Sequence, residues 1–246
     1  METTHGIHSV LVEARPHSLP VNLRQTAVIV VDMQNDFGAE GGMFARAGID
    51  ISGIQAAVAP TAQVLAAARQ AGMPVVYLKM GFKDDLSDAG GPEAPNRVRH
   101  LVAWGVGQPV IAPDGGESRV LIRNTWNTDI LPELAPEPGD RIVDKHRFSG
   151  FFETELDATL REMGITTLVF TGCTTSVCVE STLRDAFFRD YHCLLLADCS
   201  AEPVGNGLSR SNHEATLLLV ELAFGWVSDS AALLRALAEQ PVAATV

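Results

Sequence analysis

The sequence has no long hydrophobic run. No stretch of its 246 residues approaches the roughly 20 consecutive apolar residues that a membrane-spanning helix needs. The first residues, METTHGIHSVLVEARPHSLP, contain no apolar core that could serve as a signal peptide. From these absences we expect a cytoplasmic protein with no membrane partner.

Cysteine and positive charge are both scarce. The 4 cysteines are too few for a disulfide scaffold in a chain of this length, so a reducing compartment fits them. The 18 Lys and Arg residues stand against 30 Asp and Glu residues, which gives a net charge of −12. Because nucleic-acid binding needs a basic face, this charge argues against a nucleic-acid partner.

Two common motifs are also missing. The spacings of Cys173 from Cys178 and of Cys193 from Cys199 do not match the cysteine pairs of structural zinc sites. The glycines of GAEGG (Gly38–Gly42) lack the GxGxxG pattern of a dinucleotide-binding loop. We therefore expect no structural zinc and no dinucleotide cofactor.

What the sequence does contain is a regular alternation of short apolar runs and helical patterns. Strand-like runs stand at Ala27–Met33, Met73–Met80, Arg141–Lys145, Thr166–Gly172, His192–Cys199 and Gly225–Val227, and helical patterns at Ile54–Gly72, Glu153–Met163, Val177–Arg189, Ser211–Ala223 and Ser230–Glu239. Such alternation, with right-handed crossovers, predicts an α/β fold with a parallel sheet between two layers of helices. The segment Gly81–Pro138 is much longer than a normal connection, so we expect short elements inside it and a role in function.

The chain length suits one large domain. The opening of about 20 residues is polar and punctuated by proline, which is typical of an arm that precedes a domain. We divide the chain into an N-terminal arm (1–24), one α/β domain (25–240) and a C-terminal tail (241–246).

Three chemically useful residues stand at the ends of expected strands. Ligands of parallel sheets bind at the carboxyl ends of the strands, where the sequence places Asp32, Lys145 and the loop that leads into Cys178. Each residue has a simpler explanation when it is taken alone. A lone cysteine is usually a small core residue, the aspartate can cap a helix or form a salt bridge, and the lysine can be solvated.

The surroundings of Cys178 favour a nucleophile. It follows the polar turn TGCTTSV and opens the helical pattern CVESTLRDAFF. A thiol at a helix N-terminus has its pKa lowered to roughly 3.5–7.5 by the helix dipole, and the same turn directs N–H groups outward, as an oxyanion hole requires. Together with the Lys145 cation and the Asp32 carboxylate, the thiol completes a set for covalent acyl transfer.

These residues lie in three motifs that resemble those of the isochorismatase-like cysteine hydrolases. The motifs are VVDMQNDF (Val30–Phe37), VDKHRFSGFF (Val143–Phe152) and TGCTTSVCVESTLRDA (Thr171–Ala186), and the similarity extends from about Thr26 to Leu237. The resemblance implies a Rossmann-like three-layer fold with a six-stranded parallel sheet, in dimers or tetramers. It also implies that the Asp32, Lys145 and Cys178 set hydrolyses amide or ureido bonds through a thioester-type intermediate. By the same resemblance, the Cys173–Thr174 peptide is cis, and the Thr174 and Cys178 N–H groups form the oxyanion hole.

Within that family, four stretches most resemble the ureidoacrylate amidohydrolases of pyrimidine degradation: GGPEAPN (Gly90–Asn96), RFSGFF (Arg147–Phe152), CVESTLRDAFF (Cys178–Phe188) and FGWVSD (Phe224–Asp229). The chain departs from that pattern at Met80 and Phe82, where we expect an Asn-Gly-Trp-like stretch, and at Phe148, where we expect a tyrosine. Because both changes remove polar groups from the pocket wall, the preferred substrate is expected to shift. The expected substrate-binding residues are Phe37, Met80, Phe82, Asn96, Trp126, Phe148, Gly150 and Phe151, and the expected partners of a substrate carboxylate are Asn96, Arg97, Arg99 and the Gly150–Phe151 backbone.

The main prediction is thus a metal-independent amidohydrolase acting on a ureidoacrylate-like substrate. The alternatives are an amidase of biuret, an N-carbamoyl amino acid, a nicotinamide-like or less polar amide, and an inactive scaffold. Metal-assisted relatives carry several histidines after the second strand, whereas here KMGFKDDLSDAGG has none before His100. Five other histidines are expected to face solvent: His5, His8, His17, His146 and His213.

Overall fold

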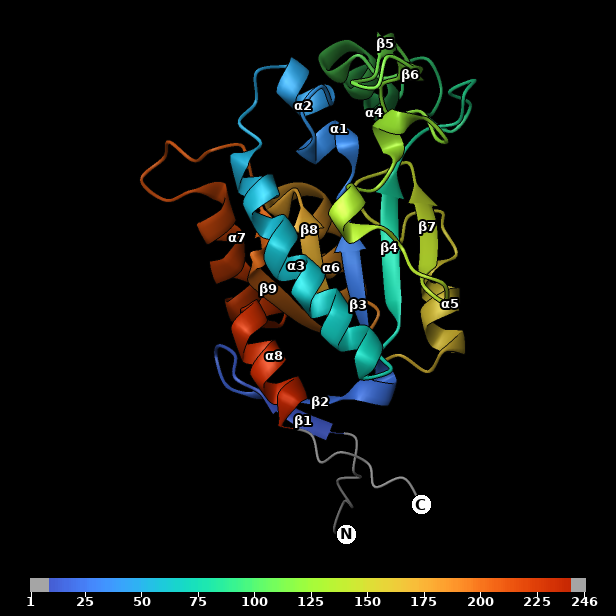
Figure 1. The fold of residues 1–246 in the computed structure, drawn as a ribbon. Helices are drawn as coiled ribbons and strands as arrows, with labels where there is room; N and C mark the ends of the chain where they lie inside the picture. The colour runs from blue at the N-terminus through green and yellow to red at the C-terminus, as the bar shows by residue number, and fades with distance from the viewer. Residues whose placement is uncertain (1–8, 240–246) are drawn as a thin grey trace.

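A six-stranded parallel sheet forms the centre of the computed structural model, which describes residues 9–239. Its strand order is β10-β9-β8-β3-β4-β7, and every neighbouring pair is parallel (Figure 1). The strands are β3 (Thr26–Val31), β4 (Val75–Met80), β7 (Arg141–Lys145), β8 (Thr167–Cys173), β9 (His192–Ala201) and β10 (Trp226–Ser228). The predicted sheet is confirmed, including its number of strands.

Helices cover both faces of this sheet, which confirms the three-layer fold. The longer helices are α3 (Ser52–Gln70), α5 (Leu156–Glu162), α6 (Glu180–Phe187), α7 (Asn212–Leu219) and α8 (Ser230–Ala238). Successive β3 residues point to opposite faces. Val28 packs in the core cluster that includes residues of α3 and α8, and Ile29 packs in the cluster that includes residues of α5 and α6. Figure 1 shows α3 and α8 in front of the sheet and α6 behind it.

The segment before β3 is not a free arm over its described part. Two short strands, β1 (Ser9–Val12) and β2 (Leu19–Asn22), pair antiparallel and bury Val12, Leu19 and Val21 in the core. The hairpin packs against α8. Residues 1–8 of the expected arm and the expected tail (241–246) lie outside the described residues, and the division into arm, domain and tail stays a prediction.

Most of the inserted segment, as we call Gly81–Pro138, lies above the carboxyl ends of β4 and β7 (Figure 1), and its last turn (Pro132–Leu134) packs against α3. It contains the short elements that were expected: α4 (Pro95–Val98), a π-helical turn (Arg99–Ala103), β5 (Pro109–Ile111) paired with β6 (Glu117–Arg119), and two 3₁₀ turns (Trp126–Thr128 and Pro132–Leu134). Two further short helices, α1 (Asn35–Gly38) and α2 (Met43–Arg46), follow β3 at the same end of the sheet. The carboxyl end of the sheet is therefore covered by segments that are far apart in the sequence.

A glycine lets β8 end tightly against β3. Gly172 has φ of +112°, and a Cβ atom there would meet the Val31 carbonyl oxygen at 2.0 Å. The close approach brings the next residue, Cys173, beside Asp32, and its thiol donates to the Asp32 carbonyl at 3.2 Å. The helix expected at Val177–Arg189 begins earlier, with a π-helical turn (Thr175–Val179) that continues into α6.

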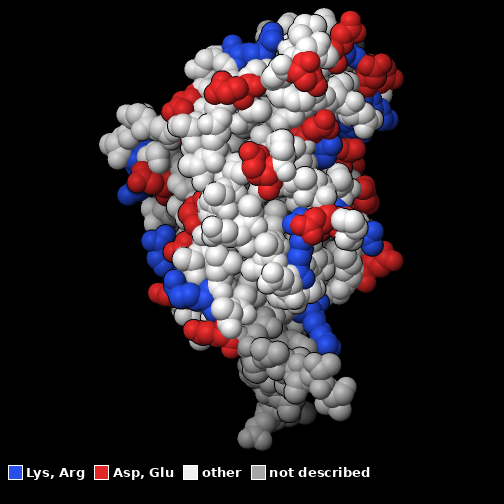
Figure 2. Space-filling model, viewed as in Figure 1, with Lys and Arg blue, Asp and Glu red and all other residues white. Residues whose placement is uncertain are grey.

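The surface shows no concentration of one charge on the face drawn in Figure 2, where acidic and basic groups are interspersed around a broad uncharged centre. No helix within residues 9–239 is both long and apolar enough to cross a membrane.

Candidate active site

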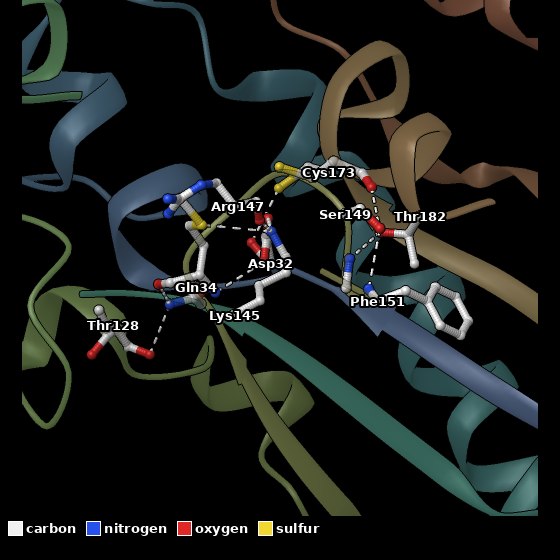
Figure 3. A network of polar contacts seen from close by, with 12 residues as sticks. Asp32, Gln34, Thr128, Lys145, Arg147, Ser149, Phe151, Cys173 and Thr182 are labelled. Atoms are coloured by element: carbon white, nitrogen blue, oxygen red, sulfur yellow. Dashed lines mark hydrogen bonds and ion pairs between the residues drawn. The ribbon is translucent and has the colours of Figure 1, made fainter. Parts of the chain in front are cut away.

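Asp32 and Lys145 form a fully buried ion pair at the carboxyl end of the sheet. The Lys145 ammonium nitrogen lies 2.7 Å from Oδ2 of Asp32, and the side chains are 0% and 1% exposed (Figure 3). Lys145 also donates to the Arg147 carbonyl at 3.2 Å. Because two charges removed from water need close pairing and further hydrogen bonds, this geometry accounts for how both ions are accommodated.

The backbone at Asp32 turns its carboxylate over the end of β4. Asp32 directly follows β3 and has φ of +52°, in the left-handed region that non-glycine residues rarely adopt. Its Oδ1 accepts the Met80 N–H at 3.0 Å. Gln34 also stabilises the end of β4, since its amide accepts the Met80 N–H and donates to the Met80 and Thr128 carbonyls. Strained backbone of this kind is common at functional sites.

Cys178 lies beside this pair, in the fourth position of the π-helical turn. Its thiol lies close enough to the Asp32 carboxylate and the Lys145 ammonium group to shift the pKa values of both. Thr182, one turn further along, donates to the Cys178 carbonyl at 2.7 Å and accepts the Gly150 N–H at 3.0 Å. The three residues that the sequence singled out therefore meet, from β3, β7 and the turn after β8.

The expected lowering of the Cys178 pKa is wrong. Burial raises the pKa of this thiol well above its ordinary value, and the Asp32 carboxylate raises it further, while Lys145 opposes both. Burial also raises the pKa of Asp32 despite the neighbouring Lys145 cation. The pKa of Lys145 is raised as well: burial alone would lower it, but Asp32 and Cys178 outweigh that effect. Desolvation of the buried thiol is the largest influence on its pKa and outweighs the effect of the helix N-terminus.

The peptide between Cys173 and Thr174 is cis, as the family resemblance implies. Thr174 lies in the cavity wall beside Cys178. Among the hydrogen bonds of residues 9–239, none uses the Thr174 N–H as donor. That N–H is therefore free to donate to a bound ligand.

A cavity of about 350 Å³ opens above Cys178. Most of its wall is apolar, and a few polar side chains interrupt it. The lining residues are Phe37, Met43, Phe44, Met80, Arg99, His100, Trp104, Leu121, Phe148, Thr174, Ser176, Val177, Cys178, Glu202, Val204 and Asn212. Small-molecule sites typically combine such walls with a few convergent polar groups.

Three of the expected substrate-binding residues line this cavity: Phe37, Met80 and Phe148. The Met80 sulfur lies 3.7 Å from the Lys145 ammonium nitrogen, so this side chain reaches the buried ion pair. The ring of Phe148 is partly exposed and stacks obliquely against His100, with 5.4 Å between ring centroids.

The other five lie outside the cavity. Phe82 is fully buried behind His100, with its ring edge against the imidazole. Asn96 donates to the Ala89 carbonyl. Trp126 lies in a 3₁₀ turn whose carbonyl accepts from Asn35.

The remaining two of these, Gly150 and Phe151, cannot offer their backbone to a carboxylate as expected. Their N–H groups donate to the hydroxyls of Thr182 and Ser149, and the Phe151 ring packs against Tyr191 in the core. Arg97 is also occupied, because it donates to the Leu86 carbonyl. Of the expected carboxylate partners, only Arg99 lines the cavity.

Glu202, which was not predicted as a site residue, lines the cavity directly after β9. Its carboxylate is buried and accepts the Ser176 N–H at 3.0 Å, the Ser176 hydroxyl at 2.5 Å and the Val204 N–H at 3.0 Å. The signal was present, because Glu202 is a charged residue at the end of an apolar strand, like Asp32. Asn212, Trp104 and Phe44 were also missed, and no periodic pattern marks them.

Two histidines differ from their expected exposure. His146 is buried, and His213 is half-buried with its Nδ1 3.0 Å from the Thr175 hydroxyl. His17 is exposed as expected, whereas His5 and His8 lie outside the described residues. Within residues 9–239, no group of three or more His, Cys, Asp or Glu side chains is arranged to hold a metal ion.

Comparison with known proteins gives a consistent set of relatives. The isochorismatase domain model matches residues 26–232. The chain is 41% identical over 233 residues to the ureidoacrylate amidohydrolase RutB of Methylobacterium radiotolerans, covering 95% of this chain and 86% of that protein. It is 43% identical over 216 residues to the protein of the same name from Variovorax paradoxus, covering 87% and 82%.

Solved structures agree with these matches. A cysteine hydrolase from Pseudomonas syringae pv. phaseolicola superposes with a TM-score of 0.76 and 32% identity, covering 94% of this chain and 98% of that one. An N-carbamoylsarcosine amidase from Thermoplasma acidophilum superposes with a TM-score of 0.61 and 26% identity, covering 84% and 96%.

Proposed function

The chain belongs to the isochorismatase domain family, and from that premise we propose that it is a cysteine-dependent amidohydrolase that cleaves a C–N bond of a small ureido or amide substrate. One observation carries the proposal. Cys178 lines a substrate-sized cavity, and its thiol lies close enough to the buried Asp32–Lys145 pair to shift the pKa values of both groups. A nucleophile, a proton acceptor and a fixed cation at one point are what covalent acyl transfer requires.

The first half of the reaction forms a covalent intermediate. Asp32 accepts the proton of the Cys178 thiol as the sulfur bonds to the substrate carbonyl carbon. The raised pKa values of both groups suit this role, because the thiol stays protonated until attack and the carboxylate is a stronger base than usual. The Thr174 and Cys178 N–H groups donate to the oxyanion. The C–N bond then breaks, and the leaving nitrogen takes the proton from Asp32.

The second half releases the acyl or carbamoyl group. Asp32, ionised again, accepts a proton from a water molecule, whose oxygen attacks the carbonyl carbon of the intermediate. The carbon–sulfur bond breaks, and the thiolate recovers its proton from Asp32. Lys145 keeps its charge throughout and stabilises whichever of its two partners is anionic.

The names of the relatives indicate a ureido substrate, since two of them are ureidoacrylate amidohydrolases. Ureidoacrylate is an acid, and Arg99 is the cavity-lining residue that suits its carboxylate. Met80 and Phe148 make the wall more apolar than such a substrate needs. We therefore propose a preference for ureido or amide substrates with a larger or less polar acyl side, and detectable turnover of ureidoacrylate itself.

A release assay tests the function directly. Purified protein is offered ureidoacrylate, biuret, N-carbamoyl amino acids, nicotinamide and simple aryl amides, and the released ammonia or amine is measured. We expect turnover of a ureido or amide compound that is abolished by Cys178→Ala. Activity above a tenth of wild type in that variant would refute the mechanism. Failure of the whole panel, with no covalent adduct in mass spectra, would favour the inactive-scaffold alternative.

Three finer statements belong to the same proposal. We propose that the protein takes part in pyrimidine degradation, that it acts in the cytoplasm, and that it forms a homodimer or homotetramer. The first follows from the relatives' substrate, and the last from what the family resemblance implies.

A further inference from the structure

Asp36 is a buried carboxylate that the proposed mechanism does not use. It is 0% exposed and lies in α1, four residues after Asp32. Unlike Asp32, it forms no ion pair with any of the residues 9–239. Its partners are neutral N–H donors, and burial raises its pKa to about 6. Since a buried charge without a counter-ion lowers stability, the fold gains little from a carboxylate here.

The donors that converge on Asp36 come from two different walls of the cavity. Oδ1 accepts the Met43 N–H at 2.9 Å, at the start of α2, and Oδ2 accepts the Leu121 N–H at 2.7 Å, in the inserted segment. The side chains of Met43 and Leu121 both line the cavity. Asn127 also donates to Oδ1, and its own amide oxygen accepts the Ser118 hydroxyl at 2.5 Å.

Leu121 needs such support. Its φ of +48° lies in the left-handed region, which is unfavourable for a non-glycine residue and persists only where neighbours enforce it. Two hydrogen bonds hold it: its N–H donates to Asp36, and its carbonyl accepts the Phe82 N–H at 2.8 Å. The conformation of this wall residue therefore depends on Asp36.

We propose that Asp36 is a positioning residue for substrate binding: its carboxylate ties the α1–α2 side of the cavity to the inserted segment and so fixes the wall against which the acyl side of the substrate packs. The proposal rests on the proposed function in that the cavity above Cys178 is taken as the substrate site. It is distinct from the chemistry, because none of the hydrogen bonds of Asp36 involves Asp32, Lys145 or Cys178.

The isosteric variant Asp36→Asn tests the role. Its amide keeps one acceptor oxygen but directs an NH₂ donor at either the Leu121 or the Met43 N–H, so one of these two hydrogen bonds is lost. We expect KM for the best substrate to rise at least tenfold while kcat stays within threefold of wild type. The matched control is Asp50→Asn, since Asp50 is an exposed carboxylate that also accepts a backbone N–H, that of Ser52. The control should leave both constants unchanged.

A double-mutant cycle separates positioning from a general loss of structure. Leu121→Gly tolerates the positive φ without support and removes the wall side chain. In that background, Asp36→Asn should raise KM less than threefold further, because the Asp36–Leu121 hydrogen bond no longer has a wall side chain to position. An equal rise in both backgrounds, or a fall in kcat at constant KM, overturns the proposal. If Asp36→Asn does not fold, Asn127→Ala must raise KM instead, and an unchanged KM overturns the proposal.

A second readout does not depend on turnover. The alkylation rate of Cys178 by N-phenyl iodoacetamide is compared with that by iodoacetamide, because the aromatic reagent must fit the cavity. Asp36→Asn should lower this ratio at least fivefold, and Asp50→Asn should not. An unchanged ratio in Asp36→Asn counts against the positioning role. Wild type that shows the aromatic preference but hydrolyses nothing in the panel would instead refute the proposed function alone.

Discussion

The ammonium nitrogen of Lys145 lies 2.7 Å from the carboxylate of Asp32, and neither side chain is accessible to solvent. Each group thus keeps the other charged, because a lone ion in this place would be strongly disfavoured. The Cys178 thiol shares both of them, so a change in any one of the three groups alters the protonation of the other two.

Removal of the cation should therefore abolish catalysis through Asp32. In Lys145→Met the carboxylate is buried without a counter-ion, its pKa rises further, and it is already protonated when a base is needed. We expect kcat to fall at least a thousandfold. The double variant with Cys178→Ala should lose less than another tenfold relative to Cys178→Ala, because residues that act as one unit are not additive. Additive losses would show that they act separately.

Asp32→Asn should make the Cys178 thiol more reactive toward alkylating reagents and at the same time slow the hydrolysis of substrate. The Asp32 carboxylate raises the pKa of Cys178, while Lys145 lowers it. Without the carboxylate the thiol pKa falls, so the thiolate fraction at pH 7 increases. We expect iodoacetamide to alkylate Cys178 several times faster in this variant than in wild type, although hydrolysis falls by orders of magnitude. Slower alkylation would mean that Asp32 activates the resting thiol, contrary to the mechanism.

The fold could be predicted from the sequence because the signals that specify it are local. The strand β3 is a short run in which five of six residues are β-branched, and α3 ends two residues before Gly72, which has φ of +72°. Asp32 and Lys145 could also be predicted from a local signal, since each is a charged residue at the end of an expected strand. A charge at such a position indicates either a charge partner or a ligand site. Glu202 could have been found in this way and was not.

Other features of the site are properties of the tertiary structure alone. Phe82 and Phe148 lie in similar sequence surroundings, yet one is buried behind His100 and the other lines the cavity. Neither the inserted segment, which contains Phe82, nor the loop after β7, which contains Phe148, has a periodicity that would distinguish them. The prediction of a lowered Cys178 pKa was wrong for the same reason, because the position of a residue at the start of a helix does not reveal how deeply its side chain is buried.

Phe148→Tyr should shift substrate preference toward ureidoacrylate. Phe148 lines the cavity beside His100, and its side chain is 39% exposed, so the fold can accept an added hydroxyl. A hydroxyl there offers a polar substrate a partner that the wild-type wall lacks. We expect the ratio of kcat/KM for ureidoacrylate over an aryl amide to rise about fivefold, with Phe152→Tyr, on a nearby exposed ring outside the cavity lining, as control. A wild type that already prefers ureidoacrylate a hundredfold, with a smaller ratio in Phe148→Tyr, would contradict the assigned preference.

The pH dependence of stability should carry a signature of Asp36. Its pKa is about 6 in the folded protein and 3.8 ordinarily. The folded state therefore takes up a proton more readily than the unfolded state, and stability rises as the pH falls through 6. Linkage gives about 1 kcal/mol of added unfolding free energy between pH 7.5 and pH 5. Urea denaturation at the two pH values should show this increment in wild type and its absence in Asp36→Asn; equal changes in both proteins would exclude a raised pKa.

Arg99 should determine whether the substrate can be an acid. Among the cavity-lining residues it is the only lysine or arginine, and Glu202 is the only carboxylate. The carboxylate of an anionic substrate is therefore favoured only at the Arg99 end of the cavity, because a carboxylate that enters an apolar cavity without a cation is heavily penalised. Arg99→Met retains the apolar stem and removes the charge. We expect KM for ureidoacrylate to rise at least tenfold, whereas KM for its uncharged methyl ester stays within threefold.

The control is Arg46→Met, since Arg46 is an exposed arginine of α2 that follows the cavity residues Met43 and Phe44 but does not itself line the cavity. It alters the net charge equally, so any general field effect on an anionic substrate appears in both variants and weakens with added salt. A loss specific to Arg99→Met and to the acid therefore reports direct pairing. Equal losses for acid and ester would instead mean that Arg99 only shapes the wall, and the substrate carboxylate would have to face solvent.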